Sequence, residues 1–418
     1  MTAQKVSVII VSQGRPEHLA RCLESLHKQT HPSFEVVVVA DNLPPDFASS
    51  VRYIPFEKQN IAAARNLGIS NSTADIIAFC DDDAIPDPPW LERLITPFET
   101  SKIGSTTGFT RGRNGISRQW GAFRFDRDGN DLATQVDETA PFTIFPADTN
   151  TPVKLLGTNM AFRKTALMAV SGFDAAFHFF LEDADIKLQL DSKNWECAIV
   201  PSAQIHHRYA ASPRRSQNRI PTDLHEIGAS KAYFCRKHNP QNIDTALERF
   251  EGEQQQRLTA MLAVKHLTQA NVDTLMQSLR AGFARGMERE TSGDISAHPP
   301  EFNAFQTCSG SHILLCATVL DRKWMRKTAR DLTDKGHRIS VVYLMPTTFF
   351  FQVSFKDGYW LHKGGVWGKS QRSQPLIQLI THRKRFSQEA RRIDLIHPID
   401  EIRFRNSTFS RDEAHFLT

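Results

Sequence analysis

Apolar and polar positions along the first hundred residues follow two alternating periods. Continuous runs of mostly β-branched residues at 5–11 and 34–40 predict buried strands. Between them, apolar residues recur at helical spacing from 17 to 29, behind Pro16, which a first helical turn tolerates. A strand, a helix and a strand in this order predict a parallel pair joined by a right-handed crossover.

The same alternation continues to about residue 100 and then weakens. Strands are predicted at 52–55 and 75–80, a helix rich in small residues at 60–72, and a further helix near Trp90. Between 111 and 149 the period is irregular and we assign no chemistry, although the stretch RFDRDGNDL is compatible with a turn or hairpin. The expected fold class is α/β, with a mostly parallel sheet flanked by helices.

Polar residues follow three of the predicted strands. Ser12 and Asp41 follow the strands at 5–11 and 34–40. A run of three carboxylates, Asp81, Asp82 and Asp83, follows the strand at 75–80. Ligands of open α/β sheets bind beyond the carboxyl ends of the strands. Adjacent carboxylates repel one another, and a hard divalent cation such as Mg²⁺ or Mn²⁺ would relieve that repulsion. Taken alone, the three aspartates are also compatible with an acidic turn that caps the next helix.

Further acids and two histidines lie in the next part of the chain. Glu182 and Asp183 follow the apolar residues FFL and begin a helical pattern. A carboxylate that emerges from an apolar wall is expected to have a raised pKa, which suits a general base, whereas acids in a first helical turn also act as caps. His206 and His207 follow a strand expected at 195–201. A neutral imidazole can complete a Mn²⁺ site, although histidines are often structural.

Together these segments resemble the family 2 nucleotide-sugar glycosyltransferases, which are inverting enzymes with a GT-A fold. The resemblance is carried by VSVIIVSQGRPEHLARCLESLHKQ, FEVVVVAD, NIAAARNLGI and IIAFCDDDAIPDPPWL, in that order. It continues in GTNMAFRKTAL, GFDAAF and LEDADIKLQL and covers roughly residues 5–238. The order and spacing of the segments are far more specific than any one of them.

The resemblance implies roles for residues on the donor side. In the aspartate cluster, Asp83 would bind the metal, while Asp81 and Asp82 would lie nearer the nucleotide. The positions that match nucleotide-contacting residues of the family are Ser12, Asp41 and Arg65. The guanidinium of Arg65 suits a phosphate on its own chemistry as well, although a surface ion pair is equally compatible with the local sequence.

The acceptor side of the resemblance supplies the remaining roles. The acidic pair of the family provides the catalytic base, and this role falls on Asp183, with Glu182 as its neighbour or substitute. One of His206 and His207 would be the C-terminal metal ligand, and we favour His206. The implied cofactor is a divalent cation, Mn²⁺ or Mg²⁺.

The chain divides into three parts by pattern. Residues 1–240 form the expected GT-A-like domain, 241–300 a helical segment and linker with helix throughout 243–285, and 301–418 a small α/β region. A strand–helix–strand unit at 312–344 weakly resembles the start of a GT-B glycosyltransferase domain. Only about a hundred residues remain, too few for the two Rossmann-like halves of a GT-B enzyme, so an accessory or truncated region is expected.

Composition agrees with an ordinary soluble globular protein. Hydrophobic residues make up 40% and charged residues 23% of the chain, and the net charge of +5 permits anionic partners without requiring one. The basic stretch at 381–392 is expected to be a solvated helix, although anionic lipid would also suit it. No apolar run reaches the roughly 20 residues that span a bilayer, and the N-terminus lacks a signal-peptide pattern. Six cysteines without metal-type spacing are expected to be buried thiols of a cytoplasmic protein.

The expected function is transfer of a sugar from a nucleotide-sugar donor to an acceptor hydroxyl, in cell-surface glycan or polysaccharide biosynthesis. The acceptor is expected to be a glycan, a lipid-linked glycan or a protein, with peripheral membrane contact left open and no nucleic-acid partner. Two alternatives stay open: a non-catalytic carbohydrate- or nucleotide-binding scaffold, and a nucleotidyltransferase. A nucleotidyltransferase normally carries a Gly-rich basic loop near its N-terminus, whereas the stretch VSQGRPEHL has one glycine.

Overall fold

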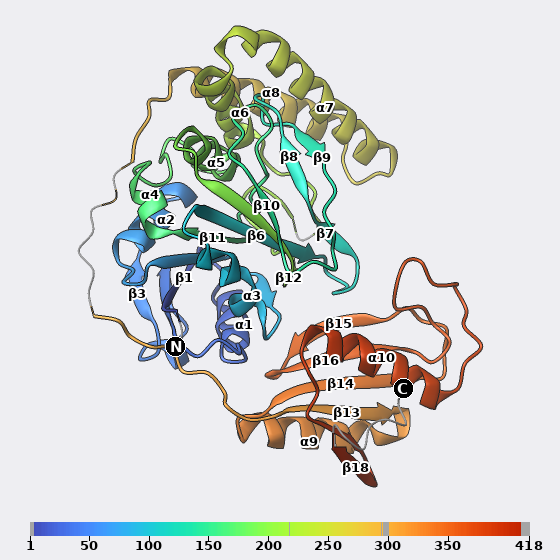
Figure 1. The fold of residues 1–418 in the computed structure, drawn as a ribbon. Helices are drawn as coiled ribbons and strands as arrows, with labels where there is room; N and C mark the ends of the chain where they lie inside the picture. Colours follow the sequence, from blue (N-terminus) through green and yellow to red (C-terminus); the bar gives the residue numbers. More distant parts are fainter. Residues whose placement is uncertain (1–3, 217, 294, 296–300, 411–418) are drawn as a thin grey trace.

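A computed structural model describes residues 4–216, 218–293, 295 and 301–410. Its main sheet has ten strands and runs in the order β10-β12-β6-β11-β4-β1-β2-β3, with β5 paired to β12 and β7 to β6 (Figure 1). The strands are β1 (Val6–Ser12), β2 (Phe34–Ala40), β3 (Arg52–Pro55), β4 (Ile76–Cys80), β5 (Ala84–Pro86), β6 (Ile103–Arg111), β7 (Arg118–Trp120), β10 (Thr143–Phe145), β11 (Asn159–Arg163) and β12 (Glu196–His207). A separate hairpin pairs β8 (Phe123–Phe125) with β9 (Asp131–Ala133), within the stretch where a turn or hairpin was compatible.

The N-terminal half of the sheet is parallel. Strand β1 lies between β2 and β4 and is parallel to both, and β3 adds a further parallel strand. All residues of β2 and β4 are buried, as continuous apolar strands covered on both faces should be. Ser12 pairs with Ala40 at the carboxyl end of β1. The strand ends that carry the candidate residues therefore meet at one edge of the sheet.

Helices cover both faces of this sheet. On one face, α1 (Pro16–Leu26) packs against alternate residues of β1 and β2, and α3 (Trp90–Ile95) lies against β12 and β6. On the other face lie α2 (Ile61–Ser70), α4 (Lys164–Met168) and α5 (Glu182–Ser192). The predicted α/β class, with a largely parallel sheet between helices, is confirmed.

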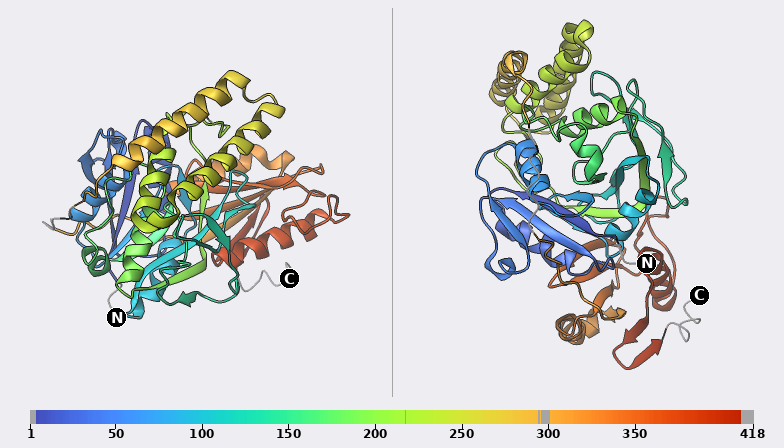
Figure 2. Two further views of the ribbon diagram at one scale, coloured as in Figure 1. Left: turned by 90° about the horizontal axis from the view of Figure 1, so that it is seen from above. Right: turned by 60° about the vertical axis from the view of Figure 1, so that its left-hand side comes forward.

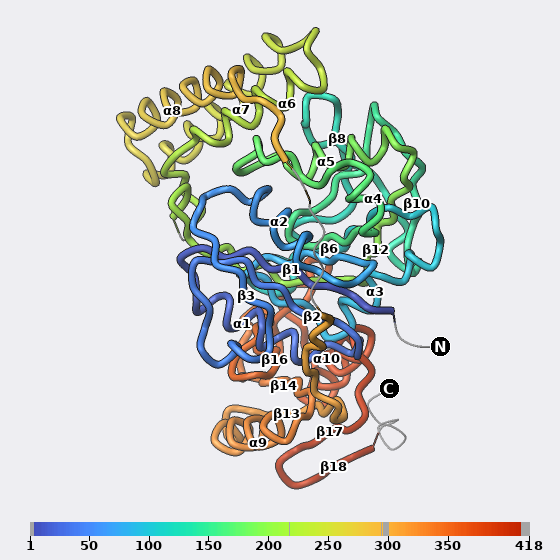
Figure 3. The backbone as a smooth tube through the Cα atoms, turned by 90° about the vertical axis from the view of Figure 1, so that its left-hand side faces the viewer, coloured from blue at the N-terminus to red at the C-terminus, as the bar shows by residue number. Residues whose placement is uncertain are grey.

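The helical segment differs from the prediction in one respect. Helix α6 (His225–His238) is followed by α7 (Ile243–Ala263) and α8 (Gln269–Glu288), so the uninterrupted helix expected over 243–285 is wrong. The break has a local cause, because Thr268 and Asn271 form a capping box that starts a new helix. The two long helices lie side by side at one end of the molecule (Figures 2 and 3).

The C-terminal region forms a second, six-stranded sheet in the order β15-β16-β14-β13-β17-β18 at the opposite end (Figure 3). Its elements are β13 (His312–Thr318), α9 (Arg322–Asp334), β14 (Arg338–Met345), β15 (Gln352–Lys356), β16 (Tyr359–Gly365), α10 (His382–Ile396), β17 (Glu401–Phe404) and β18 (Ser407–Ser410). Four short 3₁₀ helices complete the described structure: η1 (Pro45–Phe47), η2 (Thr96–Glu99), η3 (Pro240–Asn242) and η4 (Val319–Asp321).

The two sheet regions are in direct contact. The linker returns along β2, where the Phe305 backbone N–H donates to the carbonyl of Phe34 at 2.7 Å. The Phe305 ring joins the apolar core between α1, α3 and the main sheet. Arg338 of β14 donates to the carbonyls of Lys28 and Gln29, just after α1, at 2.9 Å each. The three-part division at 240 and 300 stays a prediction, and residues 294 and 296–300 of the expected linker lie outside the described residues.

Two expectations from composition concern cysteines and membrane spans. The cysteines are free thiols, and five are buried, whereas Cys308 is half-buried, which corrects the expectation that all six are buried. Within the described ranges, none of the helices combines the length and hydrophobicity that crossing a bilayer requires.

Candidate active site

Three residues from two strand ends form a compact group of metal-ligand type. One ligand atom each from Asp81, Asp83 and His207 lies within 4.8 Å of the others. The aspartates follow β4, and His207 is the last residue of β12. Strand β12 reaches the aspartates because its final residues pair with β5, with His207 opposite Ala84.

Asp83 is the most strongly stabilised carboxylate of this group. His207 Nε2 lies 3.1 Å from Asp83 Oδ1, and the Ala210 backbone N–H donates to Oδ2 at 2.7 Å. The guanidinium of Arg15 lies 3.6 Å from the same Oδ2. Burial alone would raise the pKa of Asp83, but the hydrogen bond and charge of His207, the Arg15 charge and the Ala210 N–H hold it well below its usual range. Asp83 is therefore a permanent anion that can hold a cation.

Asp82 is not a member of the metal-type group and has partners of its own. It is buried, accepts a hydrogen bond from the Ser12 hydroxyl at 2.7 Å and pairs with Arg15 at 2.7 Å. Burial raises the pKa of Asp82 to about 7, against the opposing effects of Arg15 and Ser12. Ser12 and Asp82, both expected to contact a nucleotide, are thus engaged with each other and fix the position of Arg15.

The geometry favours His207 over His206 as the histidine of the metal-type group. Successive side chains of a strand point to opposite faces, so when His207 faces Asp83, His206 faces away. His206 Nε2 lies 3.0 Å from Asp87 Oδ1, and its ring packs on Trp360 of β16 at 4.6 Å between centroids. The prediction also ended the strand at 201, whereas β12 continues through both histidines.

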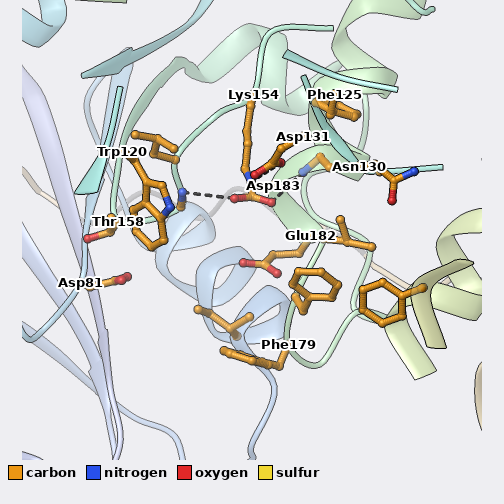
Figure 4. Close-up of a pocket in the computed structure, with 18 of the residues that line it drawn as sticks. Asp81, Trp120, Phe125, Asn130, Asp131, Lys154, Thr158, Phe179, Glu182 and Asp183 are labelled. Carbon is orange, nitrogen blue, oxygen red and sulfur yellow. Dashed lines mark hydrogen bonds and ion pairs between the residues drawn. The ribbon is translucent and has the colours of Figure 1, made fainter. Parts of the chain in front are cut away.

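A cavity of about 530 Å³ connects the aspartate group with the start of α5. Asp81 lies at one side, Glu182 and Asp183 at the other, and Trp120 stands between them (Figure 4). The aromatic residues that line the cavity are Trp120, Phe125, Phe179, Phe180 and Phe250. A wall that combines aromatic side chains with charged groups is typical of a binding site for a small organic ligand.

The two acids at the start of α5 have different partners. Glu182 Oε1 accepts from Arg65 at 2.8 Å, and Arg65 also donates to the Gly157 carbonyl at 3.0 Å. Asp183 accepts from the backbone N–H groups of Gly157 and Ala184, at 3.2 and 2.8 Å. Burial raises the pKa of Asp183, although the charges of Lys154 and Arg65 oppose it. Arg65, for which a phosphate contact and an ion pair were both compatible, forms an ion pair with Glu182, and both acids line the cavity.

The backbone before α5 is strained. Phe180 and Leu181 have φ values of 75° and 67°, the left-handed region that residues other than glycine rarely adopt. Each such residue costs of order 1–3 kcal/mol unless the surroundings hold it, and such residues cluster at functional sites. Phe180 packs on Phe250 of α7, with ring centroids 6.2 Å apart. The helical segment thus supports the turn that presents Glu182 and Asp183.

Three further polar residues lie near the candidate site, and the sequence had singled out only Asp41. Asp41 is exposed at the end of β2 and accepts from the Gly14 N–H at 2.8 Å. Arg15 was missed, although it comes three residues after Ser12 at the same strand end. Lys154 lines the cavity and pairs with Asp131 of β9 at 2.5 Å. The sequence did not indicate Lys154 as a site residue, because its partner lies in the stretch 111–149, where no regular pattern was found.

Comparisons with known proteins point to one family. Residues 7–170 match the model of glycosyl transferase family 2. The chain is 32% identical over 131 residues to glycosyltransferase AglE of Haloferax volcanii, covering 27% of this chain and 43% of the relative. It is 25% identical over 191 residues to glucosyl-dolichyl phosphate glucuronosyltransferase of the same organism, covering 41% of this chain and 56% of the relative.

Two further comparisons complete the set. The succinoglycan biosynthesis protein ExoM of Rhizobium meliloti is 32% identical over 124 residues, which are 26% of this chain and 40% of that protein. The crystal structure of GalNAc-T7 with UDP, GalNAc and Mn²⁺ aligns with a TM-score of 0.43 and 15% identity, over 56% of this chain and 50% of that one. The chain spans about half the length, or less, of the curated relatives it matches. Over residues 7–170, the chain is therefore similar to glycosyl transferase family 2.

Proposed function

We propose that this protein is a divalent-cation-dependent, inverting glycosyltransferase that moves a sugar from a nucleotide-sugar donor to an acceptor hydroxyl. The observation that carries the proposal is the single cavity lined by Asp81 on one side and by Glu182 and Asp183 on the other. Carboxylates at two sides of one cavity suit a donor and an acceptor held face to face.

Asp81, Asp83 and His207 would hold the cation. Their ligand atoms converge within 4.8 Å, and two carboxylates with one imidazole are ligands that Mn²⁺ accepts. When bound, the cation would supply positive charge to the diphosphate of the donor. Arg15 and Arg215 lie 3.6 and 4.0 Å from Asp83 Oδ2 and add guanidinium charge on the same side. Asp41 and Asp81 remain the proposed nucleotide contacts.

Asp183 would accept the proton of the acceptor hydroxyl. Its raised pKa makes it a stronger base than an ordinary aspartate, whereas Glu182 is held by Arg65. As the proton leaves, the acceptor oxygen forms a bond to the anomeric carbon. The bond from that carbon to the diphosphate oxygen breaks, and its electron pair departs with the diphosphate. One displacement of this kind inverts the configuration at the anomeric carbon.

The relatives suggest a biological setting for this reaction. One is named for a dolichyl phosphate substrate and another for succinoglycan biosynthesis. We therefore propose a role in cell-surface glycan or polysaccharide biosynthesis, with a lipid-linked glycan, a glycan or a protein as the acceptor. The proposed place of action is the cytoplasmic side.

Donor binding and turnover test the proposal together. Thermal unfolding is followed with UDP-, GDP- and dTDP-sugars, each with and without Mn²⁺, because a ligand of the folded state raises the melting temperature. We expect one nucleotide-sugar to raise it only in the presence of Mn²⁺, and the same donor to release its nucleoside diphosphate slowly. Binding without release, unchanged in Asp183→Asn, would favour the scaffold alternative. Release of diphosphate from a nucleoside triphosphate with a sugar phosphate would favour a nucleotidyltransferase.

A further inference from the structure

Exposed apolar side chains gather at one end of the C-terminal region. Fourteen large hydrophobic residues are exposed in the described part of the chain, and five of them lie in the segments 346–351 and 366–381. These five are Phe349, Phe350, Leu376, Ile377 and Leu379, exposed by 65%, 53%, 64%, 58% and 92%. A gathering of this kind, unlike single exposed residues, marks an interaction surface.

Backbone hydrogen bonds hold the two segments together. The Trp367 N–H donates to Thr347 O at 3.2 Å, and the Phe351 N–H donates to Lys369 O at 3.0 Å. The second segment folds back on itself, because the Gln378 N–H donates to Trp367 O at 2.9 Å. The loop that leads into α10 projects from the C-terminal region (Figure 1). The five apolar residues thus belong to one folded surface, which we call the apolar tip.

The charge around the apolar tip has one sign. From 358 to 388 the sequence contains no aspartate or glutamate but six lysines and arginines. Five of them, Lys363, Lys369, Arg372, Arg383 and Lys384, are exposed or half-buried, whereas Arg385 is buried and pairs with Glu389 at 3.5 Å. Lys369 lies over the Phe350 ring, with its ammonium 4.9 Å from the centroid. Cations therefore alternate with exposed apolar groups on the same surface.

A basic cavity opens beside the apolar tip. It has a volume of about 700 Å³ and lies between the loop before α10 and the strands β6 and β7. Five cationic residues line it, Arg111, Arg118, Lys369, Arg372 and Arg392, against one carboxylate, Glu138. Phe350 and Phe351 line it as well, so the cavity adjoins the apolar tip. An anionic group of phosphate size would fit this charge.

We propose that this end of the C-terminal region docks on an anionic phospholipid surface. The side chains of the apolar tip enter the boundary between headgroups and acyl chains, and the surrounding cations face the negative lipid phosphates. One apolar insertion with several nearby cations is the combination that holds a peripheral protein on a membrane without a spanning helix. The inference concerns a surface outside the cavity at Asp183 and does not rest on the proposed transfer reaction.

Vesicle co-sedimentation of the full chain tests the proposal. The probes are phosphatidylcholine vesicles with and without phosphatidylglycerol, at low and high salt. We expect binding only to the anionic vesicles, weakened by salt. The variant Leu376→Ser/Ile377→Ser/Leu379→Ser should lower partitioning at least about a hundredfold, since each residue loses its burial in the bilayer. Arg372→Gln/Lys384→Gln should lower it by roughly 25-fold, about fivefold for each cation.

Matched controls separate this surface from general hydrophobicity. Leu320→Ser and Leu395→Ser remove leucines that are exposed by 86% and 82% elsewhere in the same region, and both should bind as the wild type does. Equal weakening by these controls, or no vesicle binding by the wild type, would overturn the proposal. So would a wild-type dimer in lipid-free buffer that the triple serine variant abolishes, which would assign the surface to a second copy of the chain. Binding to an oligonucleotide that depends on the cations alone, without vesicle binding, would assign it to nucleic acid.

Discussion

The neighbouring histidines of β12 give a matched test of the metal site. His207→Gln removes one of three converging ligands, whereas His206→Gln changes the same residue type on the opposite face, at Asp87. We expect the Mn²⁺ affinity, measured by calorimetric titration, to fall at least about tenfold in His207→Gln. Removing a residue that only orients a metal ligand already lowers metal affinity by about this factor, and His207 would be a ligand itself. His206→Gln should keep the wild-type affinity. The reverse order would mean that the metal does not bind between Asp81, Asp83 and His207.

A second prediction at this scale concerns the base. Asp183→Asn should lower kcat by roughly 10²- to 10⁴-fold, the usual contribution of a positioned general base. The base must be ionised, and burial raises the pKa of Asp183, so wild-type kcat should fall as the pH drops through this raised pKa. Initial rates against pH measure the effect. Asp183→Asn should retain the Mn²⁺-dependent thermal shift with the donor, and loss of that shift would mean that Asp183 acts in binding.

Single residues also show where sequence reasoning stopped. The parallel strand ends brought Ser12 and the aspartates together because such ends share one edge of a sheet. The choice between His206 and His207 required knowing how far β12 extends and how it passes the irregular register after Val200. For Arg65, the sequence was compatible with a phosphate contact and with an ion pair. The structure shows a buried ion pair with Glu182, a partner 117 residues away that the local sequence could not indicate.

At the scale of elements, α6 and α8 approach closely through glycines. A Cβ at Gly282 would lie 2.1 Å from the His225 carbonyl oxygen, so Gly282→Ala would push the helices apart. We expect a loss of about 1–3 kcal/mol in the free energy of unfolding, measured with urea. Gly252→Ala on α7 has no heavy atom within 4 Å of the new Cβ and should instead stabilise by about 0.5–1 kcal/mol. Similar effects from the two variants would argue against the close contact.

An ion pair at the same junction predicts a pH dependence. Glu226 of α6 pairs with Arg289 at 2.7 Å and with His178 at 3.3 Å. Burial would raise the pKa of Glu226, but hydrogen bonds and charges from His178 and Arg289 lower it to about 2. Because the folded pKa lies below the unfolded value, this stabilisation is present above pH of about 4.5 and is lost as the pH falls towards 2, in total up to about 3 kcal/mol.

Urea unfolding at pH 5 and pH 3 measures this term. Glu226→Gln should be less stable than the wild type at pH 5, and the difference should shrink at pH 3 as the wild type loses its ionised carboxylate. Glu288→Gln is the control, because its ion pair with Arg285 lies on the exposed surface of α8 and contributes little. A constant difference between wild type and Glu226→Gln at both pH values would contradict the assignment.

At the scale of the whole molecule, contacts between distant parts of the chain were the hardest feature to predict from the sequence. The pattern predicted both α/β parts, because continuous apolar strands and amphipathic helices are local features. It could not predict that the linker returns along β2, since the contact of Phe305 with Phe34 joins residues far apart in the chain. Nor could it predict that His206, expected at the metal, would pack on Trp360 of the C-terminal sheet.

The contact between the two sheets can be tested at Arg338. Its guanidinium donates to the carbonyls of Lys28 and Gln29 near α1 and to those of Cys308 and Gly310 in the linker, at 2.7–3.1 Å. Arg338→Gln removes charge-assisted hydrogen bonds that each contribute about 1.5–3 kcal/mol. Two of these bonds, to the carbonyls of Lys28 and Gln29, join the C-terminal region to the main sheet region. Their loss should weaken this interface by about 3 kcal/mol or more.

Scanning calorimetry should therefore separate one unfolding transition into two in Arg338→Gln, because each sheet region keeps its own core. Limited proteolysis should cut the variant within 301–311 faster than the wild type, since the linker loses the donor that holds its carbonyls. Arg330→Gln on α9 breaks a surface pair with Asp357 and should change neither result. A single transition at the wild-type temperature would mean that Arg338 does not couple the two regions, and that other contacts such as Arg93 with the Ile396 carbonyl, at 2.6 Å, hold them together.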